Sequence, residues 1–479
     1  MSPEERRKLQ EQLRRLNHRE AENVEASRTF LPLWTHTMAL RPETVIVRGG
    51  RGAGKSALFN LLRDLPVSSR VREFFQDNEI PHAKWLDAFS QQGMLHPSVE
   101  ILDEFARQAD DADLRLFWMV HLFVRLNTIL GKSAPPVPQE LKACLPAQGS
   151  QSVHVQVEVA RAQTSALSAW FDGVERRLAE KQEYVFVAYD HLDRIGSLFQ
   201  ETRSRYIRAL LVLWLSLSNR YRWLRAKIFL REDLFDPARL GFPDVTKLRA
   251  RSASLDWDVE SLYRVVVRHM ASQSSEMRRW LVGVPGVELR DRNEFGFIPG
   301  PMPEHVIKAF ADRLAGELMG SGVKKGYTHR WIPNRLQDAQ IRVVPRSMLT
   351  LIGEAASSSM KRDFPSESPR LLASQDLSGA LPRTSEQRVA EVQEEYPLAG
   401  RLENLRGELV LLPEEKAISL LGQPSKSEAA GAPTDGSAVL EELIALGVLA
   451  RRKDGRIDVP DIYRYGFGIK RKGGVARPK

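Results

Sequence analysis

Four residues near the start of the chain have the types and the spacing needed to bind phosphate. Gly49, Gly54, Lys55 and Ser56 form the pattern Gly-x4-Gly-Lys-Ser within the segment TVIVRGGRGAGKSALFNLL. Glycines let the backbone curl so that successive N–H groups point at one anion, and a helix N-terminus adds its positive dipole end. The lysine reaches the β- and γ-phosphates, and the serine hydroxyl binds magnesium. The pattern predicts a phosphate loop for a nucleoside triphosphate.

The elements around this pattern are those that a phosphate loop requires. Thr44–Val47 is a short β-branched run that predicts a buried strand, and Ser56–Leu62 predicts the start of a helix. The order of strand, glycine loop and helix is the one that a phosphate loop requires. It therefore favours a phosphate loop over the alternative interpretation, a plain glycine turn. We therefore expect a nucleotide-binding loop that consists of Gly49, Gly50, Arg51, Gly52, Ala53, Gly54, Lys55 and Ser56.

A second strand supplies the acid that a magnesium site needs. Tyr184–Tyr189 is a continuous apolar run, as expected for a strand of a parallel sheet that is covered on both faces. Asp190 follows it, at the end of the strand where open α/β sheets gather their ligands. Asp190 and Ser56 are the predicted metal-binding residues. Asp193 either orients and deprotonates the attacking water or caps the following turn.

A third predicted strand, Ala226–Leu230, ends in Arg231-Glu232-Asp233. If this strand lies between the other two, Arg231 faces the γ-phosphate and can sense it by a charge-assisted hydrogen bond. The alternative is that Arg231 forms a surface ion pair with Glu232 or Asp233. The predicted catalytic residues are Lys55, Asp190, Asp193 and Arg231.

With these residues the chain resembles the additional-strand P-loop ATPases, and within them the bacterial AAA+/STAND and KAP-like branches. FVAYDHLDRIG is similar to their Walker B strand, and KIFLREDLF to their sensor-1 strand. SASLDWDVESLYRVVVRHM resembles the strand and helix that follow, with Leu255 and Trp257 leading into a lid. VVPRSMLTLIGEAA resembles a lid helix that begins with Pro-Arg.

The resemblance implies further roles and shows one departure. It implies that Arg346 is a sensor-2 arginine that contacts the nucleotide, and that an arginine from a neighbouring subunit completes the site, with Arg194 and Arg203 as candidates. Most AAA+ proteins have a glutamate directly after the Walker B acid, whereas this chain has His191. Hydrolysis must then depend on Asp193 or be slow.

Composition limits the class of protein. A chain of 479 residues predicts roughly two or three domains. One cysteine, Cys144, allows no internal disulfide. The longest apolar run, Ala209–Leu217, is far shorter than the roughly 20 residues of a membrane span. We expect a cytoplasmic protein without a membrane anchor. The net charge of +9 is compatible with either a solvated surface or contact with a polyanion.

The expected fold is α/β: a P-loop NTPase core with a parallel sheet flanked by helices, then an α-helical lid and a C-terminal winged-helix-like domain. In the tail, Val439–Leu449 predicts a helix, and Leu449–Val459 predicts a β-hairpin around Asp454-Gly455. The expected segments are an N-terminal helix (1–27), the core (28–260, with a loop insertion at 131–156), the lid (261–358), a linker and helical segment (359–422), a flexible linker (423–438) and the basic tail (439–479).

Three functions are compatible with the sequence. The first is a switch that binds ATP with Mg²⁺, hydrolyses it, and controls a separate effector protein, with bacterial defence as one setting and homo-oligomers as the expected assembly. The second is a DNA-associated AAA+-like loader or remodeller whose tail, YRYGFGIKRKGGVARPK, binds nucleic acid. The third is an assembly protein that holds its nucleotide without turnover. ATP is favoured over GTP because no Asn-Lys-x-Asp guanine-reading motif is evident.

Overall fold

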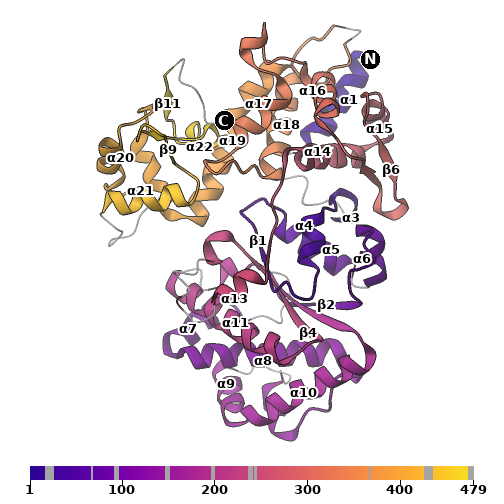
Figure 1. Cartoon of the computed structure of the whole chain (residues 1–479), viewed down its shortest axis with the longest axis vertical. Coiled ribbons are helices and arrows are strands. Elements are labelled where there is room, and N and C mark those ends of the chain that lie inside the picture. Colours follow the sequence, from indigo (N-terminus) through magenta and orange to yellow (C-terminus); the bar gives the residue numbers. More distant parts are fainter. Residues whose placement is uncertain are drawn as a thin grey trace. The chain divides into compact units, whose positions relative to one another are not determined.

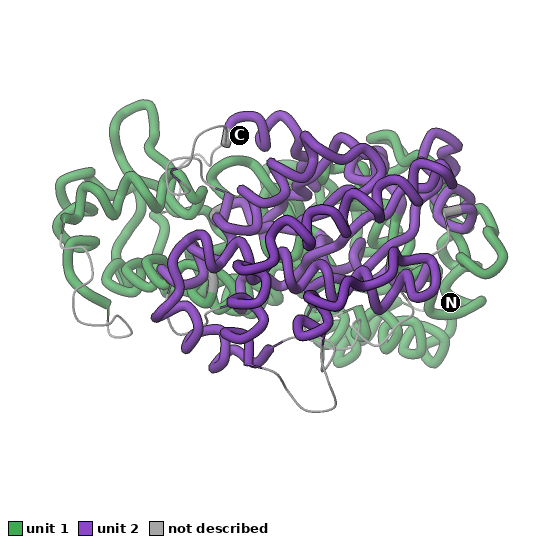
Figure 2. Tube along the Cα trace, turned by 90° about the horizontal axis from the view of Figure 1, so that it is seen from below, with its two compact units in different colours: residues 1–31, 51–53, 256–479 green, residues 32–50, 54–255 purple. Residues whose placement is uncertain are grey.

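Figure 1 shows the computed structural model of the chain, which divides into two compact units. Unit 1 contains Met1–Leu31, Arg51–Ala53 and Asp256–Lys479, and unit 2 contains Pro32–Gly50 and Gly54–Leu255, as Figure 2 shows. The domain boundaries expected from the sequence stay a prediction. The structure describes residues 1–16, 26–65, 68–90, 97–145, 152–195, 200–235, 241, 245–365, 368–425 and 435–472.

Unit 2 is built on a five-stranded sheet in the order β2-β3-β4-β1-β5. Every neighbouring pair in this sheet is parallel. The strands are β1 (Ile46–Arg48), β2 (Ala83–Phe89), β3 (Tyr184–Tyr189), β4 (Leu224–Leu230) and β5 (Ser252–Ser254). The expected α/β fold with a parallel sheet flanked by helices is confirmed, and β4 does lie between β1 and β3.

The sheet is formed by the apolar runs that the sequence contains. Val185, Phe186 and Val187 of β3 are buried, as expected when both faces of a parallel sheet are covered. The helices of unit 2 are α4 (Trp34–Ala39), α5 (Lys55–Asp64), α6 (Ser68–Phe75), α7 (Val99–Gln108), α8 (Asp111–Leu130), α9 (Val153–Ala162), α10 (Thr164–Lys181), α11 (Gln200–Arg220) and α13 (Val245–Ala250), with the short 3₁₀ helices η1 (Gly131–Ser133), η2 (Gln139–Cys144), η3 (Leu192–Arg194) and η4 (Glu232–Phe235).

Helix α8 is an apolar helix of the interior. Within the described residues, the stretch Asp111–Ser133 is the one helical segment long and apolar enough to cross a membrane, and half of its apolar window is buried inside the protein. Trp118 and Phe123 of α8 are buried, and the indole N–H of Trp118 donates to the carbonyl of Tyr206 at 2.9 Å. These contacts are those of a helix in a protein core.

The region expected to be a loop insertion, 131–156, contains short helices where it is described. These are η1, η2 and the start of α9. Residues 146–151 of this region lie outside the described residues. Leu141 and Cys144 of η2 are buried, so this part of the insertion packs into unit 2.

Unit 1 is mainly helical. Its helices are α1 (Pro3–Arg14), α3 (Ala26–Thr29), α14 (Val259–Gln273), α15 (Ser275–Val282), α16 (Glu304–Ala315), α17 (Thr328–Leu336), α18 (Pro345–Ser359), α19 (Ser374–Glu395), α20 (Glu414–Leu421), α21 (Gly436–Ala445) and α22 (Asp461–Arg464), with η5 (Asn293–Phe295), η6 (Val323–Lys325) and η7 (Pro397–Leu405). Its strands are β6 (Leu289–Asp291), β7 (Phe297–Pro299), β8 (Leu409–Val410), β9 (Ala450–Arg451), β10 (Ile457–Asp458) and β11 (Lys470–Arg471).

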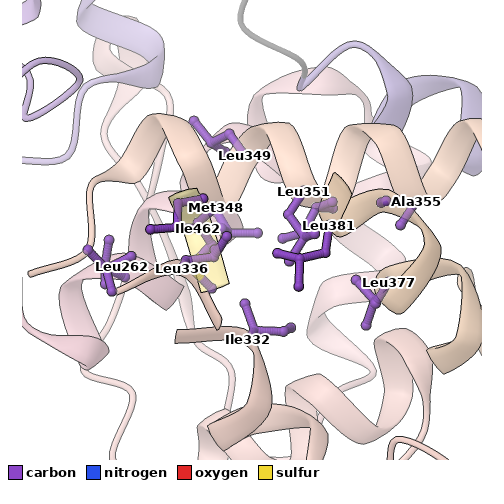
Figure 3. Packing of buried hydrophobic residues seen from close by; sticks show 14 of the residues in the cluster. Leu262, Ile332, Leu336, Met348, Leu349, Leu351, Ala355, Leu377, Leu381 and Ile462 are labelled. Atoms are coloured by element: carbon purple, nitrogen blue, oxygen red, sulfur yellow. The ribbon is translucent and has the colours of Figure 1, made fainter. Parts of the chain in front are cut away.

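One hydrophobic core runs through unit 1, from Leu9 near the N-terminus to Ile469 near the C-terminus. Figure 3 shows part of it, where Leu351 of α18 lies beside Leu381 of α19. Ile462 of α22 belongs to the same core. The C-terminal segment therefore packs together with the helices expected to form the lid.

The N-terminal helix α1 also belongs to this core. Leu9 and Leu13, which the sequence places on one face of a helix, are buried there. The Arg6 guanidinium donates to the Arg370 carbonyl at 3.1 Å, and the Gln10 amide donates to the Leu371 carbonyl at 2.7 Å. Helix α1 therefore packs against segments that follow it by about 360 residues in the chain.

The C-terminal elements follow the order helix, 3₁₀ helix, strand, helix, helix and hairpin. These are α19, η7, β8, α20, α21 and the antiparallel pair β9–β10, which is joined by the turn at Asp454-Gly455. Leu412 and Ile457 exchange two backbone hydrogen bonds of 2.9 and 2.8 Å, which connects the region of β8 to the hairpin. The predicted hairpin is present. Helix α21 starts at Gly436, and residues 426–434 of the expected flexible linker lie outside the described residues.

We expect Leu13→Ala to lower the free energy of unfolding by roughly 2–5 kcal/mol, because it leaves a cavity in a core that surrounds a fully buried side chain. Arg7→Ala, on the exposed face of the same helix, is the control and should change it by less than about 0.5 kcal/mol. Urea unfolding followed by tryptophan fluorescence measures both. Equal stability of the two variants would show that α1 does not contribute to the core.

Candidate functional site

The predicted phosphate loop connects β1 to α5. Gly52 and Gly54 have φ angles of +81° and +100°, which residues with a Cβ adopt only at a cost. Gly54 is the N-cap of α5, so the free N–H groups of this helix begin at the loop. Ser56 lies in the first turn of α5. The local geometry therefore has the two features by which such loops bind anions, a curled glycine backbone and a helix N-terminus.

The Lys55 ammonium group is held at the beginning of the loop. Its Nζ donates to the carbonyls of Gly49 at 2.6 Å and Gly50 at 3.1 Å. A lysine ammonium group has three N–H donors and no acceptor, so it binds oxygen atoms. Here these oxygens belong to the backbone that would surround the phosphates. The ammonium group therefore lies beside the backbone at the start of the loop.

Residues Arg51–Ala53, at the tip of the loop, belong to unit 1 and are held by several of its side chains. The indole N–H of Trp257 donates to the Ala53 carbonyl at 2.8 Å. The Arg388 guanidinium donates to the Arg51 carbonyl at 3.1 Å, and the Arg51 side chain forms an ion pair of 2.7 Å with Glu394. The tip is thus bonded through two backbone carbonyls and one side chain.

Gly52 leaves little room for a side chain. A Cβ added there would lie 3.0 Å from the Cβ of Arg346 and 3.4 Å from a methyl carbon of Val344. Arg346 is in the first turn of α18, directly after Pro345. The predicted sensor arginine therefore lies beside Gly52, which combines a positive φ with a close approach.

Asp190 lies directly after β3, and its backbone N–H donates to the Phe89 carbonyl at 2.8 Å. The residue is 3% exposed, and its Oδ2 has no hydrogen-bond partner among the described residues. The His191 imidazole lies beside it, with Nε2 3.5 Å from Oδ2. A buried carboxylate oxygen without a donor is costly unless a cation or its water binds there. Asp190 therefore fits the predicted role at a magnesium site.

Arg231 follows β4 and is buried, and it forms an ion pair of 3.7 Å with Asp193. This pair joins the ends of β3 and β4, which are neighbours in the sheet. Glu232, one of the two partners considered from the sequence, forms an ion pair of 2.6 Å with Arg48. The structure thus brings together two predicted catalytic residues, Asp193 and Arg231.

His191, which occupies the position of the expected glutamate, has a left-handed backbone with φ of +57° and ψ of +28°. Non-glycine residues adopt this conformation rarely. The residue precedes η3, which contains Asp193 and Arg194. The other candidate for an intersubunit arginine, Arg203, lies in α11.

Asp87 is a site residue that the sequence analysis missed. It lies near the end of β2, the strand next to β3, where its Oδ2 accepts a hydrogen bond of 2.8 Å from the Ser90 hydroxyl. Its Oδ1 is buried without a hydrogen-bond partner among the described residues. Burial raises the pKa of the Asp87 carboxyl, and the neighbouring Asp190 carboxylate adds to this shift. The available signal was the short alternating segment AKWLDAFS, which ends in two polar residues.

Trp257, Arg388, Glu391 and Glu394 belong to the surroundings of the loop tip as well. Trp257 was predicted only as the residue that leads into the lid, and the other three had no predicted role. Arg388, Glu391 and Glu394 recur every three residues along α19, a spacing that equally suits an ordinary solvent-facing helix. The local sequence therefore has no signal that α19 contacts a loop more than 300 residues away.

Comparisons with known proteins give weak similarity to solved structures. No protein-family model and no curated protein sequence matches the chain. The chain is similar to the ORC2 protein of Aeropyrum pernix (12% identity, 89% of each chain, TM-score 0.29) and to Cdc6p of Pyrobaculum aerophilum (10% identity, 89% of this chain and 84% of that chain, TM-score 0.27). It is also similar to the Walker-type ATPase paby2304 of Pyrococcus abyssi (12% identity, 94% of this chain and 97% of that chain, TM-score 0.34). Similarity at this level assigns neither a family nor a function.

We expect Gly52→Ala to lower the thermal midpoint of the ligand-free protein by a few degrees, because a left-handed alanine costs about 1–2 kcal/mol and its Cβ would crowd Arg346. Gly50→Ala is the control, since a Cβ at Gly50 meets no atom within 4 Å. Scanning calorimetry of the three proteins compares them. A Gly52→Ala midpoint equal to that of Gly50→Ala would mean that the loop tip is not held as described.

Proposed function

We propose that the chain is a magnesium-dependent ATPase that binds ATP at Gly49–Ser56 and acts as a nucleotide-controlled switch. The observation that carries this proposal is the order of the parallel sheet. Because β4 lies between β1 and β3, the phosphate loop, Arg231 and Asp190 follow three adjacent strands at one edge of the sheet. Ligands of open α/β sheets bind at this edge.

The residues present fit magnesium and ATP. Ser56 and Asp190 would hold the metal and its water shell, and the metal would neutralise charge on the phosphates. Lys55 and the loop N–H groups would bind the phosphates, while Arg231, buried beside Asp193, would face the terminal phosphate. Adenine rather than guanine stays a prediction from the sequence.

Slow hydrolysis is part of the proposal. His191 stands where a general base would be expected, and the Asp193 carboxylate is engaged with Arg231. Asp87, with one buried carboxylate oxygen that accepts no hydrogen bond from the described residues, is a further acid on the neighbouring strand. An ATPase with these groups is suited to a switch that stays in one state for a long time.

In this proposal the C-terminal elements contact the partner that the switch controls. The order α19, β8, α20, α21 and the hairpin β9–β10, with the bridge between Leu412 and Ile457, supports a winged-helix-like module. Its contacts favour a protein partner over DNA. Arg451 forms ion pairs with Glu414 and Glu441, and α21, which would read the major groove in a DNA-binding winged helix, has no lysine or arginine.

The other hairpin arginines are paired as well. Arg452 pairs with Asp458, and Arg456 pairs with Asp454 at 2.6 Å. Arginines that are neutralised inside a module contribute little to phosphate binding. Residues 473–479 of the basic tail lie outside the described residues. A bacterial defence role, an effector partner, homo-oligomers and a cytoplasmic location stay predictions from the resemblance and the composition.

The ATPase is tested by Lys55→Ala and Asp190→Asn. Lys55→Ala should weaken binding of magnesium-ATP by about 10-fold or more, because it removes the charged hydrogen bonds to the phosphates. Asp190→Asn should retain nucleotide binding but lose roughly 100-fold in phosphate release, because the metal is no longer held for the transition state. Titration calorimetry and phosphate release measure the two effects.

Lys84→Ala is the matched control, since it removes a lysine of β2 that forms an exposed ion pair of 3.0 Å with Glu183. Its nucleotide affinity and turnover should equal those of the wild type. Equal binding by the wild type, Lys55→Ala and Lys84→Ala would rule out the site. If the wild type binds nucleotide but does not hydrolyse it, the result would support the third function given above, an assembly protein that holds its nucleotide.

The DNA-associated alternative makes a different prediction. If the module binds a protein, duplex DNA should leave the rate of ATP hydrolysis unchanged, and binding of DNA should be weak at 150 mM salt, about physiological ionic strength. A rise in hydrolysis with DNA, together with a steep loss of binding as salt increases, would replace the proposed output by a DNA-associated one.

A further inference from the structure

Two buried carboxylate oxygens at the ends of β2 and β3 have no hydrogen-bond partner among the described residues. They are Oδ1 of Asp87 and Oδ2 of Asp190, and Asp190 is 3% exposed. The other oxygen of Asp87 accepts from the Ser90 hydroxyl at 2.8 Å, and the His191 imidazole lies 3.5 Å from Asp190 Oδ2, longer than a normal hydrogen bond. A buried carboxylate oxygen without a donor costs free energy, so two of them at neighbouring strand ends point to a cation as their partner.

The register of the sheet places Asp87 on the face that α5 covers. Asp87 is paired with Ala188 of β3, and Ala188 is paired with Lys227 of β4. Paired residues of parallel strands have their side chains on the same face, as do residues two positions apart in one strand. Phe229 is two positions beyond Lys227, and its ring packs against that of Phe59 of α5, with centroids 5.8 Å apart. Asp87 is therefore on the side of the helix that begins at the phosphate loop.

Asp190 continues β3 on the same face. It is two positions beyond Ala188, and its N–H donates to the Phe89 carbonyl at 2.8 Å, so the ladder between β2 and β3 extends to this residue. Burial raises the pKa of the Asp87 carboxyl, and the Asp190 carboxylate adds to the rise. Such an effect requires the two groups to be near each other.

Two buried side chains of α8 fix the end of β2. Ala88 has no register partner in β3, as in a β-bulge. The Arg125 Nε donates to the Asp87 carbonyl at 3.0 Å, and the His121 Nε2 bonds to the Ala88 carbonyl at 2.7 Å. Bulges redirect side chains beside functional sites, and here the bonds from α8 hold the redirected strand end in place.

The positive side chains near Asp87 do not account for its unpaired oxygen. Attraction by Arg125 and Arg63 lowers the pKa of the Asp87 carboxyl, against the effect of burial. Arg125 nevertheless binds the carbonyl of Asp87, and Oδ1 accepts a hydrogen bond from neither arginine. A cation from solution is therefore the partner that fits Oδ1.

We propose that Asp87 and Asp190 bind one divalent cation between them, through Oδ1 of Asp87 and Oδ2 of Asp190. Negatively charged oxygen ligands are those that magnesium and manganese prefer. The inference rests on the proposed function only where it identifies this cation with the magnesium of the nucleotide. Because both carboxylates belong to the protein, the cation also binds when no nucleotide is present.

The test titrates Mn²⁺ into the whole chain without nucleotide and measures free Mn²⁺ by electron paramagnetic resonance. The wild type should bind one Mn²⁺ that Mg²⁺ displaces. Asp87→Asn and Asp190→Asn should each weaken Mn²⁺ binding by about 10-fold or more, because each loses a charged oxygen ligand. Asparagine keeps the shape of Asp87 and an oxygen that can accept from the Ser90 hydroxyl.

Asp172→Asn is the matched control, because it makes the same charge change in an ion pair of 2.5 Å with Arg220 at the surface of unit 2. Its Mn²⁺ affinity should equal that of the wild type. Thermal midpoints in EDTA separate a metal ligand from a structural residue. Asp87→Asn should be no less stable than the wild type there, since it removes a like charge from beside Asp190. A merely structural role would lower the midpoint and leave the Mn²⁺ affinity unchanged.

Two results would overturn the inference: a wild type that binds no Mn²⁺ without nucleotide, and an Asp87→Asn affinity for Mn²⁺ equal to that of the wild type. Failure of the proposed function looks different, because the wild type and Lys55→Ala would then bind magnesium-ATP equally. Mn²⁺ binding that depends on both aspartates, without binding of ATP, would support the metal site and refute the ATPase.

Discussion

The parallel hydrogen-bond ladder that places β4 between β1 and β3 is the constraint on which the candidate site depends. Side chains that follow adjacent parallel strands emerge at one edge, so the ladder brings together residues about 180 positions apart in the chain, such as Arg48 and Glu232. Burial of Val185, Phe186 and Val187 stabilises β3 as an interior strand of this sheet, because an exposed strand would bring these apolar side chains into water. The positions of Asp190 and Arg231 follow from the strand order, because each residue comes directly after its strand, β3 or β4.

Charges around the site satisfy one another in several places. Arg231 binds Asp193, and Arg48 binds Glu232. The Asp190 carboxylate differs, because one of its buried oxygens accepts no hydrogen bond from the described residues. A site with paired arginines and an unsatisfied acid is prepared for a cation together with an anion, which is the charge pattern of a magnesium nucleotide.

Helix α19 takes part in two kinds of contact. Arg388 and Glu394 hold the loop tip, while the Ser385 hydroxyl donates to the Ile462 carbonyl at 2.6 Å and accepts from the Gly466 N–H at 2.8 Å. A Cβ at Gly466 would lie 2.7 Å from a methyl carbon of Val389, so the segment that follows α22 approaches α19 closely. The same helix therefore contacts the loop tip and the C-terminal elements, as a switch with a C-terminal output requires. The paired arginines of the hairpin also show that a net charge of +9 is not by itself a surface for nucleic acid.

The sequence by itself determined the local features: the glycine loop, the apolar strands β1, β3 and β4, the acid after β3, the amphipathic helix α1 and the Asp-Gly hairpin. Each depends on residues a few positions apart, whose periodicity and turn chemistry are visible in one short window. Only the tertiary structure decided that α1 packs against a segment about 360 residues later, that Asp193 binds Arg231, that Asp87 lies near Asp190, and that Trp257 contacts the loop tip. These contacts join distant segments through side chains of ordinary type, and their partners are chosen by the packing of the whole core rather than by any local pattern.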